Sequence, residues 1–174
     1  HAFTLWTVPE MDAIEALIED HSPRTAVVMG GGFIGLEMAE ALKERGLEVS
    51  LVEFAPQVMP NLDPEIASVL QTELTRNGVT LYTGAAVERI DDHSVILSTG
   101  DEVPADLVLI SVGVAPTTDL ARSAGLAIGE SGGVVVNEYM ESSVPHIYVA
   151  GDMAEITHTV TGKSVRIPLA GPAN

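Results

Sequence analysis

A glycine-rich turn between an apolar strand and a helix constrains this chain more than any other feature. Residues 26–35 read Ala-Val-Val-Met-Gly-Gly-Gly-Phe-Ile-Gly, and Gly30, Gly32 and Gly35 fit the pattern Gly-x-Gly-x-x-Gly. In that pattern the first glycine makes a tight turn, the second lets backbone amides approach a diphosphate, and the third lets helix and strand touch. The helix N-terminus then directs free amides and a positive dipole end at the anion. The turn therefore predicts a dinucleotide-binding site in an α/β fold.

An acidic residue ends the next apolar strand at the distance that such a site requires. Glu53 lies 23 residues after Gly30 and directly follows the apolar residues 49–52. About 20 residues usually separate the first glycine from the acid that hydrogen-bonds the adenosine ribose. Residues 46–75 contain no Lys or Arg that could receive a 2′-phosphate, so we expect NADH to be preferred over NADPH. The alternatives are an ordinary glycine-rich turn, with Gly31 leaving the register open, and a solvated acid at a strand end.

Composition narrows the class of protein further. The 174 residues suffice for one α/β domain with an appendage, and they carry a net charge of −17 from 25 acidic and 8 basic residues. This acidity disfavours nucleic acid and anionic membranes as partners, because both require positive patches. The chain has no cysteine, its five histidines lack metal-ligand spacing, and no apolar run is long enough for a membrane helix. We therefore expect no metal site and a cytoplasmic location, and the opening at His1 suggests a piece of a longer protein.

The pattern of apolar residues predicts alternating helices and strands in the first half of the chain. A capping box from Thr7 to Glu10 begins a helix that ends near Asp20. Asp63 and the proline after it begin another helix, whose expected apolar stripe is Ile66, Val69, Leu70 and Leu74. The remaining elements expected here are strands at 26–29, 49–53 and 79–82 and a helix from the glycine turn to Gly46.

After residue 82 the pattern changes to short strands. Segments 86–90 and 95–98, separated by a polar turn, predict an antiparallel meander, and the apolar run 107–112 predicts a return to the parallel sheet. Further along we expect a helix at 118–124 and strands at 134–136 and 147–150, with no strong period after residue 156. The fold class is α/β, a Rossmann-type parallel sheet with helices on it and a β-meander.

The order of motifs resembles the FAD-dependent pyridine nucleotide-disulfide oxidoreductases, and most closely their coenzyme A disulfide reductase and NADH oxidase branch. The resemblance covers nearly the whole chain. It rests on the blocks 30–37, 51–53, 111–116, 147–152, 160–163 and 167–174.

The resemblance implies a domain organisation. Residues 1–23 would be a linker and helix entering from an FAD domain, residues 24–116 the NAD-binding domain with its meander, and residues 117–174 its end and the return segment of the FAD domain. The ββα layers would thus be inserted in a larger FAD-binding fold. A first glycine-rich motif for FAD, the redox cysteine and a dimerisation domain would belong to other segments of a homodimeric parent.

The resemblance also implies a function. The parent would pass hydride from NADH to FAD and on to a disulfide or oxygen, with coenzyme A disulfide, persulfide, peroxide and oxygen all open as acceptors. This chain would contribute the NADH site and be inactive by itself. The alternative is a nucleotide-binding module without catalysis.

Individual residues acquire roles only through the resemblance. Glu37 would lie near the nicotinamide and flavin in a supporting role, Gly113 would admit the nicotinamide ring, and Asp152 would bind the ribityl hydroxyls of FAD. Taken alone, they read as a surface helix residue, a turn glycine and part of a common Gly-Asp turn. The segment 168–174 would pass the flavin. The residues expected to bind NAD are Gly30, Gly32, Phe33, Ile34, Gly35, Glu53 and Gly113.

Overall fold

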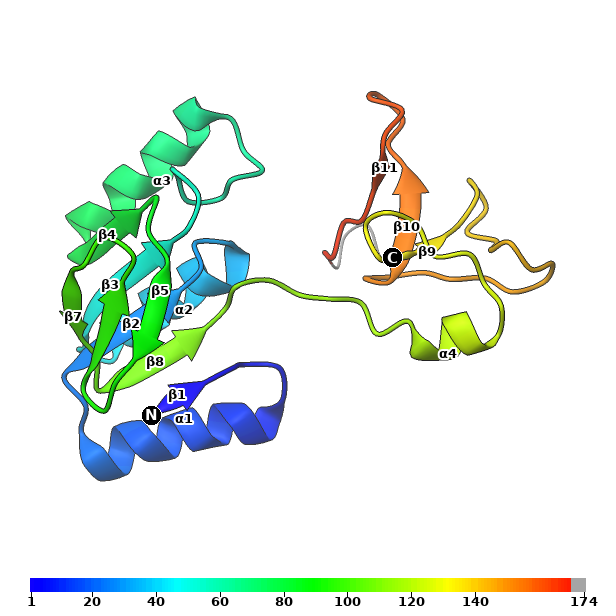
Figure 1. Cartoon of the computed structure of the whole chain (residues 1–174). Coiled ribbons are helices and arrows are strands. Elements are labelled where there is room, and N and C mark those ends of the chain that lie inside the picture. Colours follow the sequence, from blue (N-terminus) through cyan, green and yellow to red (C-terminus); the bar gives the residue numbers. More distant parts are fainter. Residues whose placement is uncertain (170–174) are drawn as a thin grey trace. The chain divides into compact units, whose positions relative to one another are not determined.

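The computed structural model describes residues 1–169 and forms two compact units, His1–Gly113 and Val114–Asn174 (Figure 1). The division falls after Gly113, and the domain boundaries that the resemblance implies stay a prediction. Residues 1–23 belong to the first unit, and their assignment to a domain of the parent stays a prediction. Residues 170–174 of the predicted flavin-side segment lie outside the described residues.

A parallel sheet forms the centre of the first unit. Its strand order is β1-β8-β2-β3-β4, and every neighbouring pair is parallel. This confirms the predicted parallel sheet, except that the sequence did not indicate the two-residue edge strand β1. The strands are β1 (Ala2–Phe3), β8 (Leu107–Ile110), β2 (Thr25–Met29), β3 (Glu48–Glu53) and β4 (Val79–Thr83).

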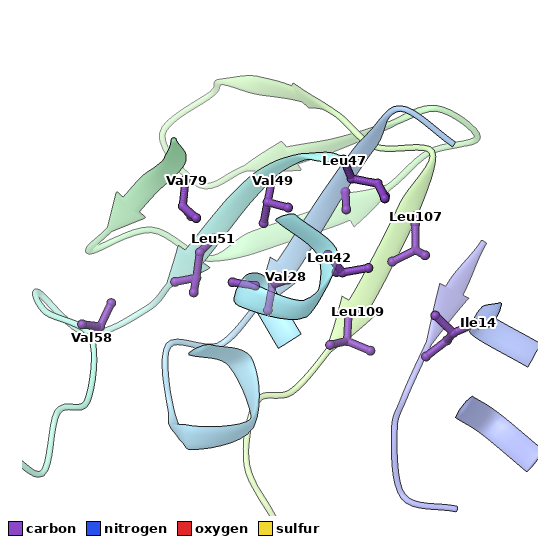
Figure 2. Packing of buried hydrophobic residues seen from close by; sticks show 12 residues of the cluster. Ile14, Val28, Leu42, Leu47, Val49, Leu51, Val58, Val79, Leu107 and Leu109 are labelled. Carbon is purple, nitrogen blue, oxygen red and sulfur yellow. The ribbon is translucent and has the colours of Figure 1, made fainter. Parts of the chain in front are cut away.

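Helices cover one face of this sheet. They are α1 (Val8–His21), α2 (Phe33–Glu44) and α3 (Pro64–Arg76). Leu42 of α2 is buried against Val28, Leu51 and Leu109 of three sheet strands, and Figure 2 shows these side chains directed toward one another. The predicted capping box also forms, because the Thr7 amide donates to Glu10 Oε2 at 2.8 Å.

The predicted apolar stripe of α3 is wrong at two positions. Ile66 and Val69 are 55% and 65% exposed, whereas Ala67 is buried and the partly buried Leu70 and Leu74 pack against the core. The helix lies over the edge strand β4, so only a narrow face of it contacts the sheet, and that face includes the buried Ala67 in place of Ile66 and Val69.

The antiparallel meander covers the opposite face of the sheet. It consists of β5 (Val87–Ile90), β6 (Ser94–Leu97) and β7 (Glu102–Pro104) in that order. Val27 and Val108 of the parallel sheet are fully buried in one cluster with Val95 and Leu97 of the meander. Successive residues of a strand point to opposite faces, so the continuous apolar runs of β2 and β8 supply both cores. The predicted layers of helix, sheet and meander are confirmed.

Asp106 fixes the amino ends of two central strands against each other. Its Oδ2 accepts hydrogen bonds from the amides of Arg24 and Thr25 at 2.9 and 3.0 Å, and from the Thr25 hydroxyl at 3.0 Å. These donors, the backbone amides above all, lower the pKa of Asp106. The contact sets the register of β2 and β8, whose opposite ends carry Gly30 and Ser111.

The second unit contains α4 (Asp119–Ser123) and a sheet of order β11-β10-β9, formed by Ser164–Val165, Ala154–Thr157 and Val134–Val135. The predicted strand at 147–150 is wrong, since only Tyr148 makes an isolated bridge there, to Glu141. Val149 is buried, but Ile147 and Tyr148 are 38% and 61% exposed, so the apolar run does not pack as a buried strand. The strand β10 was missed, because the charge of Glu155 interrupts its apolar pattern.

Candidate functional site

Three strand ends meet at the carboxyl edge of the parallel sheet. The chain turns at Gly30 after β2, at Glu53 after β3 and at Ser111 after β8. The Gly30 amide donates to the Val52 carbonyl and the Ser111 amide to the Met29 carbonyl, both at 2.8 Å. Ligands of open α/β sheets bind at this edge, so the glycine turn lies where the sequence predicts a site.

Two of the glycines are required for packing. Gly30 has a φ of +103°, and a Cβ there would collide with the carbonyl oxygen of Ser111. A Cβ on Gly35 would collide with the carbonyl oxygen of Gly30 and lie 3.0 Å from its carbonyl carbon. Helix α2 can therefore begin this close to the end of β2 only because both residues lack side chains.

Gly32 differs from both, because it faces open space. A Cβ at Gly32 would meet no atom within 4 Å, and its φ of −82° is ordinary. As the N-cap of α2 it precedes a helix whose first hydrogen bond runs from the Leu36 amide to the Gly32 carbonyl at 3.0 Å. The amides of residues 32–35 donate no hydrogen bond within the described part of the chain. These free donors and the helix dipole form an anion cradle.

The carboxylate of Glu53 is held at the mouth of this cradle. Its Oε2 accepts a hydrogen bond from the Gly31 amide at 2.6 Å, and its Oε1 accepts one from the Ala55 amide at 2.7 Å. The side chain is half-buried, and each oxygen retains acceptor capacity. An ionised carboxylate in this place can accept hydrogen bonds from hydroxyl groups, and it repels a phosphate.

These groups surround one pocket of about 570 Å³. Gly30, Gly32, Glu53 and Gly113, predicted from scattered parts of the sequence, all line it. No lysine or arginine belongs to its lining within the described residues. The other lining residues are Met29, Val52, Phe54, Pro60, Ala85, Ala86, Val87, Ser111 and Val112.

Most of these other lining residues were not predicted from the sequence to belong to the site. Phe54 follows β3 and Val112 follows β8, and both are largely exposed at 80% and 70%. The Ser111 hydroxyl donates to the Met29 carbonyl at 2.8 Å and so ties two strand ends together. A sequence signal was available for Phe54 and Ser111, because each directly follows a parallel strand.

The structure does not bring every predicted residue to this pocket. Phe33 and Ile34 lie in the first turn of α2 and are 49% and 39% exposed. Glu37 is exposed and lines a different depression of about 610 Å³ between α2 and α3. Asp152 belongs to the second unit, where it is exposed on a turn after Gly151.

The described residues carry neither a membrane-spanning helix nor a metal-binding cluster. No helix among residues 1–169 combines the length and apolarity needed to cross a bilayer. Over the same residues, no three His, Asp or Glu side chains gather closely enough to hold a metal ion.

Comparison with known proteins identifies the family. The family model described as pyridine nucleotide-disulphide oxidoreductase matches residues 3–171. A curated relative, the NAD(P)H sulfur oxidoreductase (CoA-dependent) of Pyrococcus abyssi, is 36% identical over 99% of this chain and 39% of its own length. The chain thus spans about two fifths of that relative.

Solved structures agree with this match. Reduced CoADR-RHD of Bacillus anthracis has a TM-score of 0.94 and 44% identity over 99% of this chain and 31% of its own. The water-forming NADH oxidase of Lactobacillus brevis, bound to NADH, has a TM-score of 0.87 and 30% identity over 99% and 38%. On the fold, the glycine turn and these matches, the chain belongs to the pyridine nucleotide-disulphide oxidoreductase family.

Proposed function

We propose that this chain is the NADH-binding part of a flavoprotein that passes hydride from NADH to FAD and on to a disulfide or oxygen. The observation that carries the proposal is that Gly32, the N-cap of α2 with a free amide, and the anchored carboxylate of Glu53 line one pocket. Family membership and the NADH bound to the Lactobacillus brevis oxidase support it.

The residues present fit a dinucleotide. The open face of Gly32 leaves room for a diphosphate against the amides of residues 32–35, and the net charge of −17 makes such backbone donors necessary. The remaining lone pairs of Glu53 can accept both hydroxyls of an adenosine ribose. Gly113, with a φ of +118°, lines the same pocket and lets a flat ring approach the backbone.

We further propose that NADH is preferred over NADPH. A 2′-phosphate would lie beside the Glu53 carboxylate, and the pocket lining offers no cation to offset the repulsion within the described residues. The name of the Pyrococcus abyssi relative reads NAD(P)H, and that of a Methanocaldococcus jannaschii relative reads NADH, so the names leave this choice open.

FAD would be held by other segments together with Asp152. The exposed Asp152 carboxylate can accept hydrogen bonds from ribityl hydroxyls. When bound, FAD supplies the acceptance of hydride and the onward transfer of electrons. The names of relatives, sulfur oxidoreductase and NADH oxidase, support acceptors that are sulfur compounds or oxygen. We also propose that the parent is a homodimer, as the resemblance implies, and that it is cytoplasmic, as the absence of cysteine led us to expect.

Calorimetric titration of the purified chain with NADH and with NADPH tests the proposal. We expect NADH to bind more tightly by about tenfold or more, because hydrogen bonds to a charged group are worth roughly 1.5–3 kcal/mol. Nicotinamide mononucleotide, which lacks the adenosine half, is the control ligand and should bind far more weakly. Equal or tighter binding of NADPH would contradict the role of Glu53, and no binding of NADH would contradict the site.

A further inference from the structure

Arg166 joins three segments of the second unit that are distant in sequence. It follows strand β11, and its Nη1 donates to the Asp152 carbonyl at 3.2 Å while its Nη2 donates to the Val114 carbonyl at 3.0 Å. Two carbonyl oxygens thus share one planar guanidinium, whose donors have a fixed geometry. The Gly151–Asp152 turn is thereby tied to the start of the unit.

Glu155 lies opposite Arg166 on the neighbouring strand, but it does not form an ion pair with the guanidinium. The antiparallel pairs Ile156–Val165 and Thr157–Ser164 place Glu155 opposite Arg166 as the next pair in register. Glu155 is only 3% exposed, and its Oε2 accepts hydrogen bonds from the Ser131 amide at 2.8 Å and from the Ser131 hydroxyl. No ion pair joins Glu155 and Arg166 within the described residues, so the guanidinium stays on the two carbonyls.

A glycine makes room for this arrangement. A Cβ on Gly133 would lie 3.1 Å from the Cβ of Glu155 and 3.2 Å from the Cδ of Arg166. The stem of Arg166 therefore runs over Gly133, in a slot that the absence of a side chain leaves open. This packing limits the directions in which the guanidinium can point.

Among residues 1–169, no side chain other than Arg166 forms a hydrogen bond to the Gly151–Asp152 turn. Gly151 adopts a φ of +79°, and the turn is closed by the Ala154 amide, which donates to the Gly151 carbonyl at 3.0 Å. The Asp152 carboxylate is exposed and accepts no hydrogen bond from the described residues. The backbone of Asp152 sets the direction in which its side chain leaves the chain, and Arg166 holds the carbonyl of that same residue.

We infer that Arg166 is a positioning residue that fixes the backbone of Asp152 so that its carboxylate is presented to the ribityl hydroxyls of FAD. The inference rests on the proposed role of Asp152, and it assigns to Arg166 no contact with FAD itself. A lysine at this position could reach one carbonyl but not both, so it should preserve only part of the effect.

The test measures the dissociation constant of FAD in the full-length flavoprotein that carries this chain, by flavin fluorescence on titration of FAD into apoprotein. We expect Asp152→Asn and Arg166→Met each to weaken FAD binding by about tenfold, with Arg166→Lys between Arg166→Met and the unsubstituted protein. The double variant should bind FAD no more weakly than Asp152→Asn alone, because Arg166 acts through Asp152. Arg122→Met, which removes a cation of the same unit that donates instead to Thr118, is the matched control and should bind FAD normally.

Additive losses in the double variant, or normal FAD binding by Arg166→Met, would overturn the inference. If Asp152→Asn binds FAD normally, the proposed flavin contact fails, and the inference fails with it for that separate reason. Hydrogen exchange on the 174-residue chain then tests, without FAD, whether Arg166 holds the Gly151–Asp152 turn. The amides of Met153 and Ala154 should exchange at least several-fold faster in Arg166→Met than in Arg122→Met, and equal rates would show that Arg166 does not hold the turn.

Discussion

Replacing Gly35 with alanine is expected to destabilise the first unit by about 3 kcal/mol or more, because the new Cβ would collide with the Gly30 carbonyl oxygen at the base of α2. Helix propensity alone predicts the opposite sign, since alanine within a helix is favoured over glycine by roughly 1 kcal/mol. Urea unfolding followed by circular dichroism gives the free energy of unfolding, which should fall if the collision dominates and rise if helix propensity dominates.

Gly32→Ala is the matched control in the same turn. Its Cβ meets no atom within 4 Å, so the free energy of unfolding should fall by only about 1 kcal/mol or less, the cost of alanine at an N-cap. The same Cβ enters the space proposed for the diphosphate, so NADH affinity should fall about tenfold or more. Equal stability of the two variants, or unchanged NADH binding by Gly32→Ala, would contradict the assigned roles of the two glycines.

Glu53→Gln should weaken NADH binding by roughly 10- to 100-fold, the loss expected when a charged acceptor of hydroxyl groups becomes neutral. NADPH should lose much less or gain, because the repulsion of its 2′-phosphate is removed. The ratio of NADH to NADPH affinity, measured by calorimetry on the same preparation, should therefore fall at least about tenfold.

A structural effect of this substitution must be separated from the electrostatic one. Both oxygens of Glu53 accept backbone amides, and the NH₂ group of glutamine would face one of these donors, so the turn at Gly31 or Ala55 should loosen. A loosened turn lowers the affinity for both cofactors, whereas the lost charge changes their ratio. Glu48→Gln, at the exposed start of the same strand, controls for net charge. An unchanged ratio in Glu53→Gln would contradict its contact with the ribose.

The parts of the fold that follow from local rules were predictable. The turn from Gly30 to Gly35 and the acid at Glu53 belong to one β-α-β unit, in which chain direction and strand spacing bring the groups together. The meander was predictable for a related reason, since short strands joined by polar turns pair with their neighbours. Each of these needs only contacts between adjacent elements.

The parts of the fold that depend on contacts between residues distant in sequence could not be predicted. Strand β1 is two residues long and is a strand only because it pairs with β8, more than 100 residues later. The apolar run 147–150 has strand composition, yet the sheet of its unit uses β10, whose charged Glu155 is satisfied by Ser131. Arg166 has no sequence signal at all, because its partners are the backbone carbonyls of Val114 and Asp152.

The most direct test of the central claim is to locate NADH on the chain by NMR. Titration of NADH into the ¹⁵N-labelled chain should shift the amides of residues 31–35 first and most, together with the amide of Ala55, which donates to Glu53. Shifts concentrated instead along the depression between α2 and α3, at Lys43, Leu74 and Asn77, would place the ligand elsewhere and contradict the account.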